Sequence, residues 1–245
     1  IQFPLGLIGT AISIAILPML SRQANVGNVE AFRSTLGQGL RLVLALTVPA
    51  TIGLWVLSTP VIKLVFEHGD FTPVDTVATV AALRFHLIGL VFAAVDQPLI
   101  FSFYARQDTW TPALVGVATV ILYVVAALAP TLFAPLTLNG LILANSLKWA
   151  AHALLMLILL RRRMGGLIGQ ELWRTVLTAV PLSLLMGGVV RLLVVGLSRI
   201  VPAGTWGEIV VVGVSGTVGL AVYGSLALLV GMKEIDVLRR SLRIC

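Results

Sequence analysis

The chain has 245 residues, of which 58% are hydrophobic and 11% are charged, and its mean hydropathy is +1.04. Soluble domains usually contain about 45–50% apolar and about 25% charged residues, so this composition excludes an ordinary soluble enzyme. It also excludes a disordered chain, because disordered segments are poor in apolar residues. The single cysteine, Cys245, excludes a disulfide framework and a cysteine-based metal site. We therefore expect an integral membrane protein.

Seven apolar segments are long enough to cross a bilayer. A span needs about 20 apolar residues, and a single segment can satisfy its backbone in lipid only as a helix. The predicted spans, in chain order, are residues 3–20, 37–57, 75–103, 112–133, 139–160, 173–196 and 208–231. The sequence thus predicts an all-α fold, a polytopic bundle of about seven transmembrane helices.

Lys and Arg are distributed unevenly between alternate loops. Loops 21–36, 104–111 and 161–172, together with the tail 232–245, contain ten of these residues, whereas the loops on the other side contain two. Cytoplasmic loops carry such an excess, so we expect the C-terminus to be cytoplasmic and the first span to start outside. This start, and Ile1 in place of Met, predict that the chain begins inside a larger protein. The net charge of +7 then reflects contact with anionic membrane lipids, and no nucleic acid is expected as a partner.

Charged residues inside spans are candidate functional residues, because a charge at the centre of a helix costs about 2.5–3.5 kcal/mol on insertion scales. Arg84 and Asp96 both lie in the third predicted span, but they occupy different faces of the helix. Arg84 is either a cavity cation that binds an anionic substrate or an arginine that snorkels outward. Asp96 is more typical of a partner for a neighbouring helix than of a transport residue.

The fifth predicted span carries Asn145, Lys148 and His152 on one stripe of the helix. Such a stripe faces either a wet cavity or a neighbouring helix, to which each hydrogen bond is worth about 1 kcal/mol or less. In the cavity interpretation these three residues and Arg84 bind substrate. No metal-ligand spacing and no G-x-S-x-G motif is present, so we expect no metal, no cofactor and no catalytic residue.

The most specific local pattern is the segment 103–112, which reads F-Y-A-R-Q-D-T-W-T-P between two predicted spans. It resembles the F-Y-A-R-x-D-T-x-T-P signature of the MurJ (MviN) family of lipid II flippases. Other segments resemble the same family in order and spacing. They are Pro4-Leu5-Gly6, residues 17–22, residues 65–72, Ala82-Leu83 with Gly89-Leu90, and Gly140-Leu141 with Ala144-Asn145-Ser146. The resemblance covers almost the whole chain.

The resemblance implies a fourteen-span fold of the multidrug/oligosaccharidyl-lipid/polysaccharide exporter type, which is MATE-like. In this fold two six-helix lobes enclose a central cavity, and two further helices follow. By this resemblance the chain supplies spans eight to fourteen. Residues 1–165 would form five helices of the second lobe, and residues 166–245 would form two additional helices and the tail. The first lobe of the same protein, which holds the family's main cavity arginines, would then be a partner.

The implied function is that of a flippase rather than an enzyme. It would move lipid II, the undecaprenyl-diphosphate-linked peptidoglycan precursor, across the bacterial cytoplasmic membrane by alternating access, in support of cell-wall synthesis and cell shape. Arg106 and Asp108 match the signature, and we expect them to fix the turn through charge-assisted hydrogen bonds.

Two alternatives to the flippase stay open. The first is an ion-coupled multidrug exporter, or another polysaccharide-lipid exporter, of the same fold. The second is a membrane enzyme that acts on prenyl phosphates. Such an enzyme would need acids or histidines at one face of the membrane, for which Glu67, Asp70 and His68 are the candidates.

Overall fold

The apolar segments are helical in the computed structural model, which describes residues 5–129, 137–165, 171–202, 204–232 and 234. The elements in chain order are η1 (Leu5–Thr10), α2 (Ala11–Asn25), α3 (Val29–Val56), α4 (Ser58–Phe66), α5 (Pro73–Tyr104), α6 (Trp110–Leu128), α7 (Leu138–Met164), α8 (Leu172–Ile200) and α9 (Thr205–Leu229). The π-helical η1 runs directly into α2, and together they form one span-length stretch. Among the described residues, seven helical stretches are long and apolar enough to cross a membrane. The prediction of seven spans is therefore confirmed.

The prediction and the structure differ most at two places, the start of α3 and residues 58–66. Helix α3 begins at Val29 rather than at residue 37, because Gly27 ends the preceding turn with a positive φ of 68°. The side chain of Asn28 then caps the new helix by accepting a hydrogen bond from the backbone N–H of Ala31 at 3.0 Å. Residues 58–66 were expected to form a loop but form α4, which packs against α9 and buries Ile62.

The chain is divided into two compact units. The first unit contains residues 1–47 and 85–175, and the second contains residues 48–84 and 176–245. Helices α3, α5 and α8 each supply residues to both units. The predicted division at residue 165 concerns the lobes of a larger fold, and it stays a prediction.

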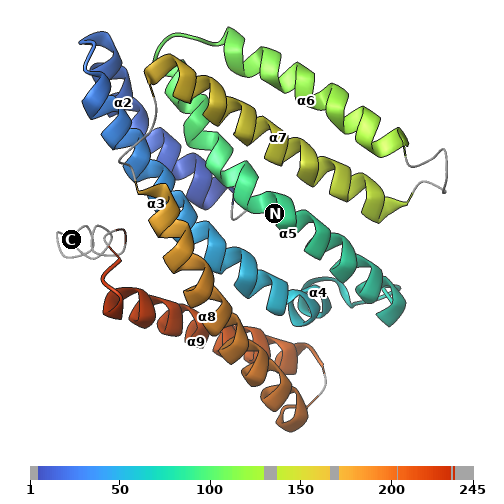
Figure 1. Ribbon diagram of the computed structural model, residues 1–245. Helices are drawn as coiled ribbons and strands as arrows, with labels where there is room; N and C mark the ends of the chain where they lie inside the picture. The colour runs from blue at the N-terminus through green and yellow to red at the C-terminus, as the bar shows by residue number, and fades with distance from the viewer. Residues whose placement is uncertain (1–4, 130–136, 166–170, 203, 233, 235–245) are drawn as a thin grey trace. The chain divides into compact units, whose positions relative to one another are not determined.

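The core of the first unit lies among α2, α3, α5, α6 and α7. Its buried side chains are Leu20, Phe32, Leu36, Leu40, Leu99, Phe103, Ala105, Val115, Met156, Leu160 and Met164. Helix α6 lies alongside α7 (Figure 1). Its other side exposes apolar residues that include Leu114, Val117 and Ile121. A helix with an apolar exposed face is typical of a lipid-facing position in a bundle.

Helices α5 and α7 approach each other closely at Gly89. A Cβ atom built on Gly89 would lie 2.8 Å from the Oγ atom and 2.9 Å from the Cα atom of Ser146. One turn earlier on α5, the carbonyl of Phe85 accepts a hydrogen bond from the Ser146 hydroxyl at 2.9 Å. The pair resembles other membrane interfaces in which small residues let two helix backbones meet.

We expect Gly89→Ala to destabilise the first unit by about 1–3 kcal/mol, because the new methyl group would meet the backbone of Ser146 and force the helices apart. The matched control is Gly213→Ala on α9, where a Cβ atom meets nothing within 4 Å. The control should be neutral or slightly stabilising, since alanine favours helix more than glycine does. Equilibrium unfolding in mixed micelles measures the free energy of unfolding of both variants. Equal losses in Gly89→Ala and Gly213→Ala would contradict the close packing at Gly89.

Candidate functional site

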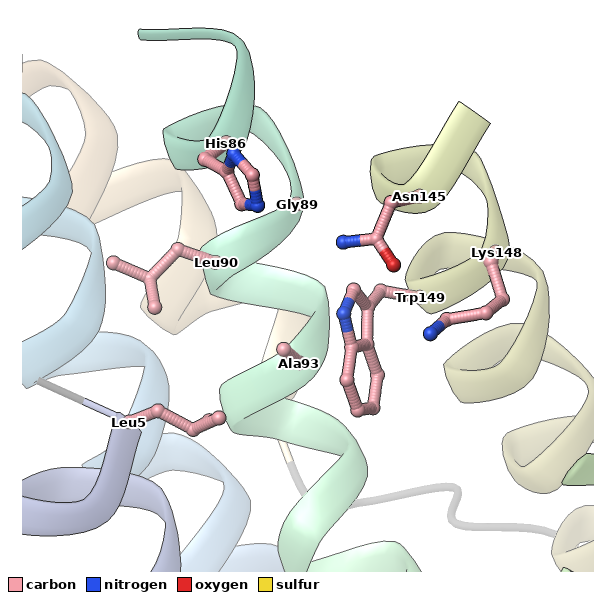
Figure 2. A pocket seen from close by; sticks show the side chains of 8 residues that line it. All are labelled: Leu5, His86, Gly89, Leu90, Ala93, Asn145, Lys148 and Trp149. Atoms are coloured by element: carbon pink, nitrogen blue, oxygen red, sulfur yellow. The ribbon is translucent and has the colours of Figure 1, made fainter. Parts of the chain in front are cut away.

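A pocket of about 370 Å³ lies between α5 and α7 in the first unit. Its walls combine apolar side chains with three polar ones, as Figure 2 shows. The lining residues are Leu5, His86, Gly89, Leu90, Ala93, Asn145, Lys148 and Trp149. Two residues of the predicted stripe, Asn145 and Lys148, therefore meet at one cavity. The close contact at Gly89 fixes the distance between the two helices that form it.

Lys148 is the lining residue that carries a permanent positive charge. Its Nζ atom lies 4.6 Å from the ring centroid of Trp149 and 6.0 Å from that of Tyr123 on α6. Both rings present an electron-rich face to the ammonium group and hold it in place. His86 on the opposite wall can add a second positive charge when it is protonated. The arrangement suits an anionic group next to an apolar surface. Sequence reasoning missed His86 and Trp149 as lining residues, because a lone histidine and a tryptophan carry no motif.

His152 lies outside the lining of this pocket. Its Nδ1 atom is 2.8 Å from the Oδ1 atom of Asp96 on α5, and both side chains are buried. The expectation that Asp96 pairs with a neighbouring helix is confirmed. The predicted stripe thus divides, with Asn145 and Lys148 at the pocket and His152 in a buried pair.

Arg84 belongs to the second unit and is half-buried there. Its Nε atom donates a hydrogen bond to the hydroxyl of Ser58 at 3.0 Å, and its guanidinium carbon lies 5.9 Å from the ring centroid of Trp55. Ser58 is itself fully buried at the start of α4. Hydrogen bonding and the aromatic face therefore hold Arg84 within the apolar part of the unit, and it does not line the pocket of the first unit.

The signature turn is held together by Asp108. Its carboxylate accepts hydrogen bonds from the backbone N–H of Thr111 at 2.9 Å and from the Thr111 hydroxyl at 2.7 Å. It also accepts one from the guanidinium group of Arg163, at the end of α7. Asp108 makes hydrogen bonds within the turn, and sequence reasoning missed its cationic partner Arg163. Arg106 is exposed and lines a separate pocket of about 120 Å³.

These bonds lower the pKa of Asp108 to about 2, chiefly through the Thr111 hydroxyl and backbone N–H and then through Arg163. A carboxyl with a depressed pKa stabilises the fold above its unfolded pKa of about 3.9, and this stabilisation is lost as the pH falls towards 2. We expect Asp108→Ala to cost about 0.5–2 kcal/mol at pH 7, as removal of other helix caps does. The difference from wild type should shrink between about pH 4 and pH 2. Thermal unfolding measured at a series of pH values reports this difference in stability. The control is Asp70→Asn, which changes an exposed carboxyl group. A pH-independent difference would contradict this role.

Glu67 and His68, two of the candidates for an enzyme site, make local hydrogen bonds. Among the described residues, no group of three or more His, Cys, Asp or Glu side chains could hold a metal ion. Glu67 accepts a hydrogen bond from the Thr76 hydroxyl at 2.5 Å, and the Nε2 atom of His68 lies 3.0 Å from the carbonyl of Leu64. Both contacts fix the local loop.

A family profile described as "Lipid II flippase MurJ" matches residues 1–211. The chain belongs to this family. A probable lipid II flippase MurJ from Rhizobium tropici is 30% identical over 99% of this chain, and one from Bdellovibrio bacteriovorus is 29% identical over 98%. The chain spans about 45% of the length of each of these two relatives. The resemblance seen in the signature and its companion segments is therefore confirmed.

A solved structure supports the same fold. It is that of a lipid II flippase MurJ in an inward closed conformation, which is similar to this chain with a TM-score of 0.70 and 24% sequence identity. The similarity covers 93% of this chain and 44% of that one. The predicted exporter-type fold is confirmed, and the seven apolar helices together with MurJ family membership define a multi-pass inner-membrane protein.

Proposed function

We propose that the complete protein containing this chain translocates lipid II across the bacterial cytoplasmic membrane by alternating access. The chain would supply the second lobe and two further helices, with its C-terminus in the cytoplasm. The observation that carries the proposal is the family match over residues 1–211. The match agrees with the uneven distribution of Lys and Arg between alternate loops.

The pocket between α5 and α7 supplies chemistry that the proposed substrate needs. A diphosphate must leave water to cross the membrane, and a nearby cation offsets its charge more strongly in a low dielectric than in water. Lys148 would donate to a phosphate oxygen, and the amide of Asn145 would accept or donate hydrogen bonds beside it. Arg84 in the second unit is a further candidate for contact with the anionic headgroup. His152 is not included, because Asp96 already occupies its Nδ1 atom.

An apolar groove of about 370 Å³ in the second unit suits the lipid tail. It is lined by Thr51, Ile52, Trp55, Val56, Leu184, Gly187 and Gly188. Such a surface can pack against a hydrocarbon chain of the substrate or of a membrane lipid through van der Waals contacts.

A translocation assay tests the proposal. The complete protein is reconstituted in vesicles with labelled lipid II in the inner leaflet, and access of an external reagent to the headgroup is followed over time. We expect protein-dependent exposure of lipid II and no accumulation of an amphipathic cationic drug in parallel vesicles. Accumulation of the drug without movement of lipid II would contradict the proposal and support the multidrug exporter.

A further inference from the structure

Asp96 and His152 form a polar pair inside the apolar interior of the first unit. Asp96 is 0% exposed and His152 is 7% exposed. The Oδ1 atom of Asp96 meets the Nδ1 atom of His152, but the buried Oδ2 atom has no hydrogen-bond partner among the described residues. A buried polar atom without a partner is costly and calls for an explanation. A proton bound to the pair lowers the cost of burying this carboxyl group, because it removes the net charge of the site.

The helices on one side of the pair bring no other charge to it. Helix α6 carries no charged residue, and it faces the Nε2 atom of His152 with Gly116, where a Cβ atom would lie 3.9 Å away. On α7 the nearest cation in sequence is Lys148, one turn before His152. The ammonium group of Lys148 lies over the ring of Trp149 and lines the pocket.

The helices on the other side add no counter-charge either. The stretch formed by η1 and α2 packs on α5 through Gly9, and its charged residue, Arg22, is exposed. The charged residues of α3 in this unit are Glu30, Arg33 and Arg41. Glu30 is exposed, Arg33 lies against Gly165, and Arg41 makes interactions of its own. Within the described part of the chain, His152 is thus the titratable group that acts on Asp96.

The charge states of such a buried pair differ greatly in free energy. An ionised Asp96 beside a neutral imidazole leaves one uncompensated negative charge in an apolar site. One proton on the pair removes the net charge, whether it resides on the imidazole or on the carboxyl. A second proton would create an uncompensated positive charge. The one-proton state is therefore favoured over the other two.

We propose that the Asp96–His152 pair is a proton-binding site that holds one proton at neutral pH. Parting of α5 and α7 at this point would break an ion pair in hydrocarbon unless the proton first moves from Nδ1 of His152 to Oδ1 of Asp96. That transfer leaves a neutral imidazole and a neutral carboxylic acid. Pro98, one half-turn beyond Asp96, removes a backbone hydrogen bond from α5 and provides a place where this helix can bend.

Counting the protons on the pair tests the proposal without any transport assay. The complete protein is labelled with ¹⁵N-histidine, and NMR reports the protonation of the imidazole between pH 5 and pH 8. Infrared spectroscopy reports the carbonyl stretch of a protonated carboxyl over the same range. His152→Gln assigns the imidazole signal, and Asp96→Asn assigns the carboxyl band. If either of these variants fails to fold, Asp96→Glu assigns the carboxyl band independently, because it shifts that band. His68→Gln in an exposed loop is the control that should leave both signals unchanged.

We expect the protonated fraction of the His152 imidazole and that of the Asp96 carboxyl to sum to one proton across this pH range. In Asp96→Asn the count should fall, because the variant has no carboxyl to hold the proton and no negative charge to offset a protonated His152. A wild-type pair with an ionised Asp96 and an imidazole that titrates near pH 6.5 would overturn the proposal. A count of zero or two at pH 7 would do the same.

Discussion

Replacing His152 by alanine should destabilise the protein by about 3–5 kcal/mol, which is the range found when one partner of a buried charged pair is removed. The reason is that Asp96, which is 0% exposed, would keep its carboxyl group in an apolar site without the imidazole that faces it. Equilibrium unfolding in mixed micelles would measure the loss.

The double variant Asp96→Leu with His152→Leu separates the pair from the packing around it. Apolar replacement of both partners is often neutral or stabilising, so the double variant should lose less stability than His152→Ala. If the loss of stability in the double variant equals the sum of the losses in Asp96→Leu and His152→Leu alone, the two side chains do not interact. That result would contradict the contact between α5 and α7 at this level of the helices.

Lys148→Gln should weaken the binding of lipid II by the complete protein by about 10- to 100-fold. A hydrogen bond to a charged group is worth about 1.5–3 kcal/mol, and a factor of ten corresponds to about 1.4 kcal/mol. Glutamine retains hydrogen-bonding capacity and most of the length of the side chain, so the change isolates the positive charge. The dissociation constant in detergent or nanodiscs is the quantity to measure.

Arg174→Gln is the matched control for this effect. The side chain of Arg174 is 76% exposed and pairs with Glu171, which immediately precedes α8, so removing its charge should leave lipid II affinity unchanged. An equal loss in both variants would mean that general membrane charge controls binding. Unchanged affinity in Lys148→Gln would remove the pocket from the proposed site.

Much of the fold could be predicted from the sequence, because composition and the length of apolar runs determine which segments cross a membrane. The stretch that forms α4 was missed for a physical reason. It is too short to span, and it becomes helical with its apolar side chains packed on α9, which lies far away in the sequence. Tertiary packing of this kind leaves little local signal.

The site could be predicted in part. Helical spacing placed Asn145 and Lys148 on one face, and the structure brings them together at a pocket. The same spacing could not separate His152 from them, because its partner Asp96 lies on another helix. Arg163 was missed as the partner of Asp108 for the same reason. In each case the pairing depends on which helices meet, and one sequence does not determine that.

The most direct test of lipid II recognition is a competition experiment by native mass spectrometry. The complete protein is offered equal amounts of lipid II and an amphipathic cationic drug, in the wild-type form and as Lys148→Gln. We expect the wild-type protein to bind lipid II selectively and the variant to lose that selectivity. Binding of the drug without lipid II in the wild-type protein would contradict the proposed flippase function.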